Sequence, residues 1–240
     1  FIKKYCGMIS SEMMIEAMDK LAKWRKLFWS EADFQFSLAQ VLYDMLKVKG
    51  VNAQIFLERP IPSKAEDTKG KRRNRYIDIL IKNGDTIYPI ELKYATKKDV
   101  VEEDYGERIL TTTQGAYDTH RFGYLYDITR LESIRKDLSN SVDLKFGRGF
   151  AILLTNDSNY YDKPENEDYK NTIDGNFRIH QDNVINPEIK WNIDESNPHW
   201  TNRYPYNEQL TLSNRPLFQW RDYKNNGATK YPVKYLINIV

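Results

Sequence analysis

Apolar residues recur at helical spacing in two segments near the start of the chain. The first segment predicts a helix over residues 11–28. A second helix should begin at Ser30, because residues 30–33 (Ser-Glu-Ala-Asp) form a variant of the capping box, and it should end at Gly50. Its apolar positions follow at i, i+4, i+7, i+8 and i+11, and they are Phe34, Leu38, Val41, Leu42 and Met45.

Three strands are predicted next. Residues 51–58 favour a strand, and a polar loop with Pro60, Pro62 and Gly70 should follow over 59–75. Residues 76–82 and 86–94 favour two further strands. The Asn-Gly-Asp turn at 83–85 predicts that these two strands form a hairpin.

The second half of the chain changes character at residue 156. Before that point, the strongly charged segment 97–109 should be solvated, a long helix is predicted over 112–138, and the continuous apolar run at 149–155 is typical of a strand buried on both faces. Residues 156–207 predict a long ordered extension with short strands. Alternating apolar residues at 233–239 indicate a last strand.

These elements predict an α/β protein with a central mixed sheet flanked by helices. We expect a single domain over 1–240, with a core of about 30–155 and an irregular C-terminal extension over 156–240.

The composition fits a soluble globular protein, with 40% hydrophobic and 29% charged residues. Lys and Arg number 36 against 34 Asp and Glu, and the net charge of +2 excludes a protein that coats nucleic acid by charge alone. Cys6 is the only cysteine, which excludes an internal disulfide and fits a reducing, cytoplasmic setting. We expect no membrane span, because no run of about 18 apolar residues occurs.

Three charged residues converge on one face of the predicted hairpin. Successive side chains of a strand point to opposite faces, so Glu91 and Lys93 share a face, and Asp78 lies on the neighbouring strand. Buried charges need partners, and two carboxylates with a main-chain carbonyl such as that of Leu92 form a ligand set suited to Mg²⁺. A cross-strand ion pair on an exposed sheet face is the simpler alternative.

Glu31 extends this pattern to the second helix. On a helical wheel it lies inside the apolar stripe, whereas Asp33 points away. A carboxylate on the core-facing side favours a role at the metal site. The alternative is an acidic residue in the first helical turn, where the helix dipole stabilises it.

The chain resembles the PD-(D/E)XK nuclease superfamily, which has a restriction-endonuclease-like core of order α-β-β-β-α-β. Asp78 matches the first acidic residue of the motif, Glu91 the second, and Lys93 the lysine. Ile77 stands in place of the proline that names the motif, and Glu31 matches a glutamate of the first helix. Gln114 and Tyr117 are similar to a further helix motif, but their spacing is one residue short.

The resemblance implies metal-dependent hydrolysis of phosphodiester bonds, most simply in DNA, by an endonuclease of restriction or defence type. Asp78, Glu91 and the carbonyl of Leu92 would hold Mg²⁺, for which Mn²⁺ can substitute, with Glu31 as a further ligand. Lys93 would orient the attacking water and stabilise developing negative charge. The product would carry a 5′-phosphate.

Basic residues just before Asp78 are candidates for contacts with phosphate. The segment from Lys64 to Arg75 contains six basic residues and only two acidic ones. The basic residues are Lys64, Lys69, Lys71, Arg72, Arg73 and Arg75. The alternative is a solvated loop. Gln114, Arg121, Tyr124 and Arg130 of the predicted long helix could also face the substrate.

Other functions remain open at this stage. One is a catalytically silent binding or regulatory module on the same fold, and another is a nuclease that acts on RNA. The aromatic residues Tyr204, Tyr206 and Trp220 could stack on bases, although a place in the core is the favoured interpretation. A homodimer is plausible, because cutting both strands of a duplex usually takes two active sites.

Overall fold

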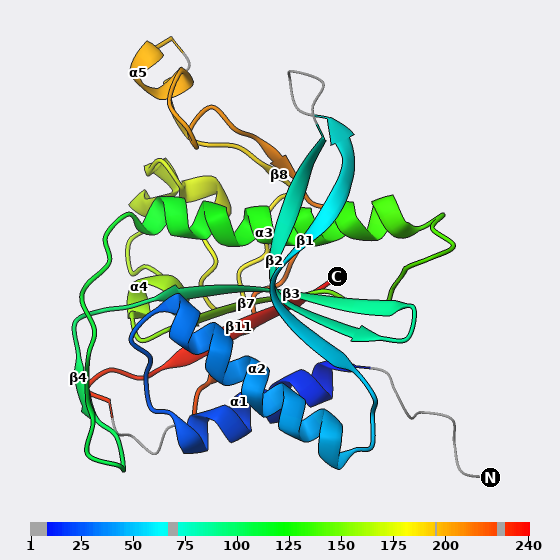
Figure 1. Cartoon of the computed structure of the whole chain (residues 1–240). Helices are drawn as coiled ribbons and strands as arrows, with labels where there is room; N and C mark the ends of the chain where they lie inside the picture. The colour runs from blue at the N-terminus through cyan, green and yellow to red at the C-terminus, as the bar shows by residue number, and fades with distance from the viewer. Residues whose placement is uncertain (1–8, 67–71, 195, 225–228) are drawn as a thin grey trace.

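The computed structural model describes residues 9–66, 72–194, 196–224 and 229–240. Among these residues, seven strands form a mixed sheet with helices on both faces (Figure 1). The strand order is β1-β2-β3-β7-β11-β10, with β6 beside β3, and β3 runs parallel to β6 and β7. The strands are β1 (Gln54–Glu66), β2 (Arg72–Asn83), β3 (Thr86–Ala95), β6 (Lys145–Phe146), β7 (Phe150–Thr155), β10 (Arg221–Asp222) and β11 (Lys234–Ile239). The prediction of a central mixed sheet flanked by helices is confirmed.

Helices α1 (Ser11–Trp24) and α2 (Glu31–Val48) pack against one face of this sheet. Ser30 caps α2 as predicted, because its hydroxyl accepts the main-chain N–H of Asp33 at 3.2 Å. Helix α1 ends before residue 28, since Arg25 has an extended main chain (φ −126°) and its guanidinium turns toward Asp33. Leu27 and Phe28, in the loop after α1, nevertheless pack in the same hydrophobic core as the helix.

The predicted polar loop over 59–75 is wrong for residues 59–66 and 72–75, which belong to strands, and residues 67–71 lie outside the described residues. Strand β1 continues through Pro60 and pairs with β2 in antiparallel register, with Pro60 opposite Tyr76. Proline is tolerated here because β1 is an edge strand of the sheet. As a result, the β1–β2 hairpin extends past α3 (Tyr117–Leu138), away from the rest of the sheet (Figure 1).

Helix α3 covers the face opposite to α1 and α2. Strand β7 lies between the two layers and is buried at every position, as predicted. Ile152 and Leu154 pack toward α1 and α2, whereas Ala151 and Leu153 pack toward α3. Helix α3 begins later than predicted, because Ala116 immediately before it has a left-handed main chain (φ 60°).

The C-terminal extension returns to the sheet. Its last strand, β11, pairs antiparallel with β7, so the central sheet includes strands from beyond the predicted core of 30–155. Between these strands lie α4 (Ser158–Tyr161), η1 (Glu167–Asn171), η2 (Gly175–Phe177), β8 (Glu188–Ile189), α5 (Pro198–Thr201) and β9 (Leu210–Thr211). In the part of the chain that the structure describes, no helix has the length and apolar character needed to cross a membrane.

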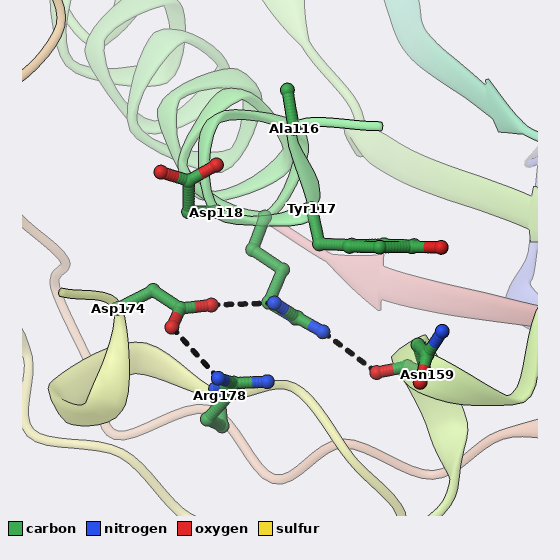
Figure 2. Close-up of a pocket in the computed structure, with 7 residues that line it drawn as sticks. Ala116, Tyr117, Asp118, Asn159, Asp174 and Arg178 are labelled. Atoms are coloured by element: carbon green, nitrogen blue, oxygen red, sulfur yellow. Dashed lines mark hydrogen bonds and ion pairs between the residues drawn. The ribbon is translucent and has the colours of Figure 1, made fainter. Parts of the chain in front are cut away.

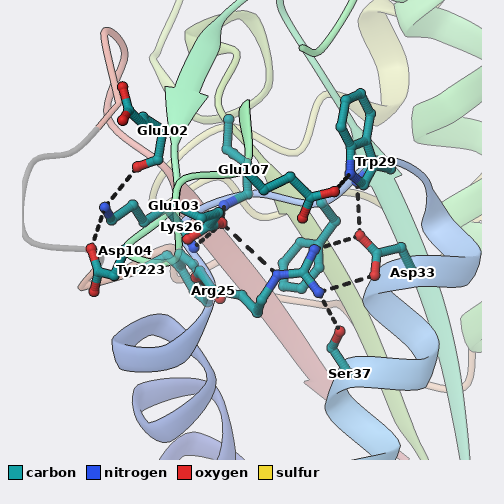
Figure 3. Close-up of polar contacts among 12 residues, drawn as sticks. Arg25, Lys26, Trp29, Asp33, Ser37, Glu102, Glu103, Asp104, Glu107 and Tyr223 are labelled. Atoms are coloured by element: carbon teal, nitrogen blue, oxygen red, sulfur yellow. Dashed lines mark hydrogen bonds and ion pairs between the residues drawn. The ribbon is translucent and has the colours of Figure 1, made fainter. Parts of the chain in front are cut away.

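The charged segment 97–109 is not uniformly solvated, contrary to expectation. Strands β4 (Val100–Glu102) and β5 (Arg108–Leu110) form a hairpin there, and the turn between them carries the buried Glu103. A carboxylate oxygen of Glu103 lies 3.8 Å from the guanidinium of Arg25, which also contacts Asp33 at 2.7 Å (Figure 3). This network ties the hairpin to the loop between α1 and α2.

Candidate active site

Asp78, Glu91 and Lys93 meet where β2 and β3 separate. The β2–β3 ladder reaches Ile79, the residue after Asp78. At that point Oδ2 of Asp78 accepts the main-chain N–H of Leu92 at 2.6 Å. The carboxylate thus takes the place of a main-chain carbonyl as the acceptor for the N–H of Leu92. It holds Asp78 beside β3, the strand that carries Glu91 and Lys93. The predicted hairpin is confirmed, and it brings the three side chains together.

Helix α3 contributes two more charged side chains at the same place. Nζ of Lys93 lies 2.9 Å from Oδ2 of Asp127 and donates a hydrogen bond to the carbonyl of Leu92 at 3.2 Å. The guanidinium of Arg130 lies 3.3 Å from Oε1 of Glu91 and 3.4 Å from Oδ1 of Asp127. The side chains of Glu91 and Asp127 are only 1% and 4% exposed. Two acidic and two basic side chains therefore form a connected cluster between β3 and α3.

Helix α2 reaches the same region from the opposite side. Glu31 is its first residue, and Oε2 of Glu31 accepts the main-chain N–H of Tyr94 at 2.9 Å. The side-chain amide of Gln35 donates to the carbonyl of Asp78 at 2.6 Å and to Oε1 of Glu58 at 2.8 Å. We define the candidate site as Glu31, Asp78, Glu91, Lys93, Asp127 and Arg130.

Burial governs the protonation of these carboxylates. It raises the pKa of Asp78 to about 6, and it raises the pKa of Glu31, Glu91 and Asp127. At Glu91 the charge of Asp127 adds to the effect of burial. Burial would lower the pKa of Lys93, but Asp127 and Glu31 outweigh it, and the pKa is raised. The site thus holds more acidic than basic groups, an imbalance that a proton or a bound cation relieves.

The oxygen donors of the site fit a hard divalent cation in chemical type. Mg²⁺ prefers such donors, and here they are the carboxylates of Glu31, Asp78 and Glu91 and the carbonyl of Leu92. Oε1 of Glu91 is buried and accepts no hydrogen bond, although Arg130 lies nearby. Among the described residues, however, no three His, Cys, Asp or Glu side chains are grouped so that they could hold a metal ion. The site fits the cation in the chemical type of its donors and in its charge, and only Oδ2 of Asp78 is engaged by the N–H of Leu92.

Two carboxylates of this region, Asp127 and Glu58, are absent from the residues predicted for the site. For Asp127 the sequence does carry a signal. On a helical wheel with the buried Tyr124 at 0°, Asp127 lies at about 300° and the buried Leu131 at about 340°. Asp127 is therefore inside the apolar stripe, as Glu31 is on its own helix. Glu58 gives no such signal, because its position depends on a left-handed main chain (φ 49°).

Arg121, predicted to contact nucleic acid, lies against the extension and away from Asp78, Glu91 and Lys93 in its contacts. The residue is 2% exposed, and its guanidinium contacts Asp174 and donates to the carbonyl of Asn159 at 2.6 Å. Arg178 binds the other oxygen of Asp174 at 2.9 Å (Figure 2). These contacts fasten the extension to α3, so Arg121 is a structural residue. Tyr124 is also buried, and its hydroxyl lies 2.8 Å from Oδ1 of Asn238 and 3.1 Å from the carbonyl oxygen of Ala151, both in the sheet.

The other predicted nucleic-acid contacts are distributed differently. Gln114 precedes α3 instead of lying on it, and its main-chain N–H donates to the carbonyl of Thr96 at 2.9 Å. Arg75 forms an ion pair of 3.2 Å with Asp137, near the end of α3. Lys71 lies outside the described residues, as do the side chains of Arg72 and Arg73, whose main chain belongs to β2.

Comparison of the chain with models of protein families, with curated proteins and with solved structures finds no match.

Proposed function

We propose that this chain is a Mg²⁺-dependent nuclease that hydrolyses DNA phosphodiester bonds, with a core of the PD-(D/E)XK type. The observation that carries the proposal is the meeting of Asp78, Glu91 and Lys93 beside a surplus of buried carboxylates. The order α2-β1-β2-β3-α3-β7 supports it, because it matches the expected α-β-β-β-α-β core with β4, β5 and β6 as additions.

Asp78, Glu91 and the carbonyl of Leu92 would hold the cation, with Glu31 as a further ligand. When bound, Mg²⁺ polarises the scissile phosphate and lowers the pKa of a bound water. The carboxylates of Asp78 and Glu91 have to be ionised to hold the cation. Burial disfavours ionisation in the metal-free protein, so DNA cleavage should fall at acidic pH.

The basic side chains act on the phosphate and the attacking water. Lys93 stays protonated beside Asp127, and its Nζ can donate a hydrogen bond to the water or to a phosphate oxygen as negative charge develops. Arg130 brings a second positive charge close to Glu91. The leaving group would be the 3′ oxygen, which leaves a 5′-phosphate on the product.

Cleavage assays test this function. Plasmid, linear duplex and single-stranded DNA are incubated with Mg²⁺, Mn²⁺ or EDTA. We expect cleavage with either metal, none in EDTA, and a loss of about a hundredfold or more in Glu91→Ala and Lys93→Ala. Lys47→Ala, an exposed position on α2, is the matched control and should cleave normally. If the wild type leaves all these DNAs intact, the proposal is wrong.

A catalytically silent nucleic-acid-binding module is the second candidate, and one observation favours it. The acidic oxygens of the site already contact the N–H of Leu92, Lys93 and Arg130 instead of converging on one point. Calorimetry with Mg²⁺ separates the two. The nuclease requires Mg²⁺ binding that Asp78→Asn weakens, whereas the silent module predicts no heat of binding in either protein.

A further inference from the structure

The candidate site is bordered by unusually exposed aromatic rings. Among the described residues, five tyrosines are more than 40% exposed, and they are Tyr43, Tyr76, Tyr105, Tyr126 and Tyr204. Three of the five, Tyr76, Tyr126 and Tyr204, belong to the surroundings of the candidate site, although they come from three different parts of the chain. Exposed aromatic rings gathered at one place call for a ligand with a flat apolar face.

Tyr76 and Tyr126 flank Arg130. Tyr76 lies two residues before Asp78 on β2, and it is 55% exposed. Its carbonyl accepts a hydrogen bond from Arg130. Tyr126 is four residues before Arg130 on α3, which places the two side chains on one face of the helix. Both residues therefore lie close to a guanidinium that contacts Glu91.

Tyr204 approaches the site from the extension. It lies three residues after the end of α5, which projects past α3 as the β1–β2 hairpin does (Figure 1). Nearby, the hydroxyl of Tyr206 donates to Asp118 of α3 at 3.2 Å, and the Tyr206 ring packs against Trp191 at 4.7 Å. Burial raises the pKa of Tyr204, and negative charge at Tyr126, Glu208 and Asp127 adds to this effect.

The favoured prediction for the aromatic residues of the tail was a place in the core. It is confirmed for Trp220, which is buried, and Tyr206 packs against the same cluster. It is wrong for Tyr204, which is 67% exposed. The contacts of Tyr206 hold this part of the extension on α3 and leave the ring of Tyr204 in solvent.

We propose that Tyr76, Tyr126 and Tyr204 form a stacking surface for unpaired bases, and that the substrate is single-stranded DNA or a single-stranded segment of DNA. In a duplex the faces of the bases are already stacked on one another, and only their edges are open in the grooves. Aromatic side chains can stack on bases only when the bases are unpaired or splayed apart. The inference rests on the proposed function, since it names the substrate of the same site.

The charges around the site support this choice. Lys93, Arg130 and Arg75 are each paired with a carboxylate of α3 or β3, so their charge is partly neutralised before a substrate arrives. Duplex DNA has the denser phosphate charge and depends more on unpaired cations than single strands do. A site with surplus acidic groups and exposed rings therefore suits a single strand better.

Binding is measured by fluorescence anisotropy in EDTA, where hydrolysis plays no part. The probes are a labelled single-stranded DNA, the same sequence as a duplex, and the RNA of that sequence. The proteins are the wild type, Tyr76→Ala, Tyr126→Ala and Tyr204→Ala, each with its Phe counterpart. Tyr43→Ala is the matched control, because Tyr43 is 52% exposed on α2.

We expect the wild type to bind the single-stranded DNA more tightly than the duplex. Each of the three Ala variants should weaken single-strand binding by roughly fivefold to a hundredfold, because one stacked base is lost. The Phe variants and Tyr43→Ala should bind as the wild type does, since the Phe ring still stacks.

Three results would overturn the inference: tighter binding of the duplex, tighter binding of the RNA, or Ala variants that bind the single strand as tightly as Tyr43→Ala. Its failure is distinguishable from failure of the proposed function. A protein that binds single strands through these tyrosines but never cleaves DNA refutes only the nuclease proposal. A protein that cleaves duplex DNA with no contribution from the tyrosines refutes only the stacking surface.

Discussion

Asp127 controls the charge of Lys93. It is almost completely buried, and it makes the shortest ion pair of that lysine at 2.9 Å. The pKa of Lys93 is raised because the charges of Asp127 and Glu31 outweigh the effect of burial. Under the proposed function, Asp127 would be a positioning residue that keeps Lys93 protonated and directs it toward the phosphate.

Asp127→Asn should therefore lower the pKa of Lys93. The loss of activity caused by deprotonation of the lysine should begin at a lower pH, and cleavage should fall by about tenfold to a hundredfold. The pH profile of cleavage and an NMR titration of the Lys93 side chain measure the two effects. Asp143→Asn, at an exposed loop position, is the control. An unchanged lysine pKa in Asp127→Asn would contradict this role.

Asp78 should make the metal-free protein less stable at neutral pH. Burial raises its pKa from 3.8 to about 6. The folded protein therefore holds this proton more tightly than the unfolded chain, and stability falls as the pH rises through that interval and is constant above it. The shift corresponds to a loss on the order of 3 kcal/mol.

Asp78→Asn removes this group. In EDTA, its free energy of unfolding should exceed that of the wild type by about 1 to 3 kcal/mol above about pH 7, and the difference should vanish below about pH 4. Urea unfolding at the two pH values measures it. An Asn variant that is less stable than the wild type at neutral pH would show that the hydrogen bond to Leu92 outweighs the cost of the buried charge.

At the scale of elements, the buried Arg25 connects three separate parts of the chain. Its side chain is 11% exposed and contacts Asp33 of α2 and Glu103 between β4 and β5. The hydroxyl of Tyr223 donates to its carbonyl at 2.9 Å (Figure 3). Removing the cation would leave the buried carboxylate of Glu103 without its ion-pair partner.

Arg25→Met should lower the free energy of unfolding by about 3 kcal/mol, because breaking a buried pair leaves an uncompensated charge. Lys23→Met provides the control, since Lys23 is exposed in the last turn of α1. Urea unfolding of the two variants measures the difference. Equal stabilities would mean that the Arg25 network contributes nothing to the fold.

Elements with local signals could be predicted from the sequence, and elements without them could not. Helix α2 has a capping serine and a regular apolar stripe, and β7 is a continuous apolar run. By contrast, the prolines of β1 indicate a loop, and only pairing with the distant β2 makes that segment a strand. The start of α3 depends on the left-handed main chain of Ala116, which the residue type does not encode.

The same distinction applies to the candidate site. Asp78, Glu91 and Lys93 could be predicted because strand alternation and one short turn bring them together. The packing of α3 on β3 brings in Asp127. The sequence pattern of α3 places that residue on the buried face of the helix, but it does not show which strand lies opposite.

At the scale of the whole molecule, the sheet depends on its last strand. Strand β11 lies between β7 and β10, so the last strand of the chain belongs to the same layer as β1, β2 and β3. Leu236 is fully buried opposite Leu153 of β7 and packs in the cluster beneath α3. Without β11, the edge of β7 and part of this cluster would be open to water.

This strand offers a matched pair of substitutions. Leu236→Ala should lower the free energy of unfolding by about 2 to 5 kcal/mol, because it opens a cavity among residues that pack against α3. Ile239→Ala, on the same strand at a position that is 48% exposed, should cost less than about 1 kcal/mol. Urea unfolding followed by tryptophan fluorescence measures both.

Because α3 also carries Asp127 and Arg130, Leu236→Ala should weaken Mg²⁺ binding at temperatures where the fold begins to loosen, whereas Ile239→Ala should not. Equal costs for the two substitutions would mean that β11 is a peripheral strand and that the candidate site is held without it.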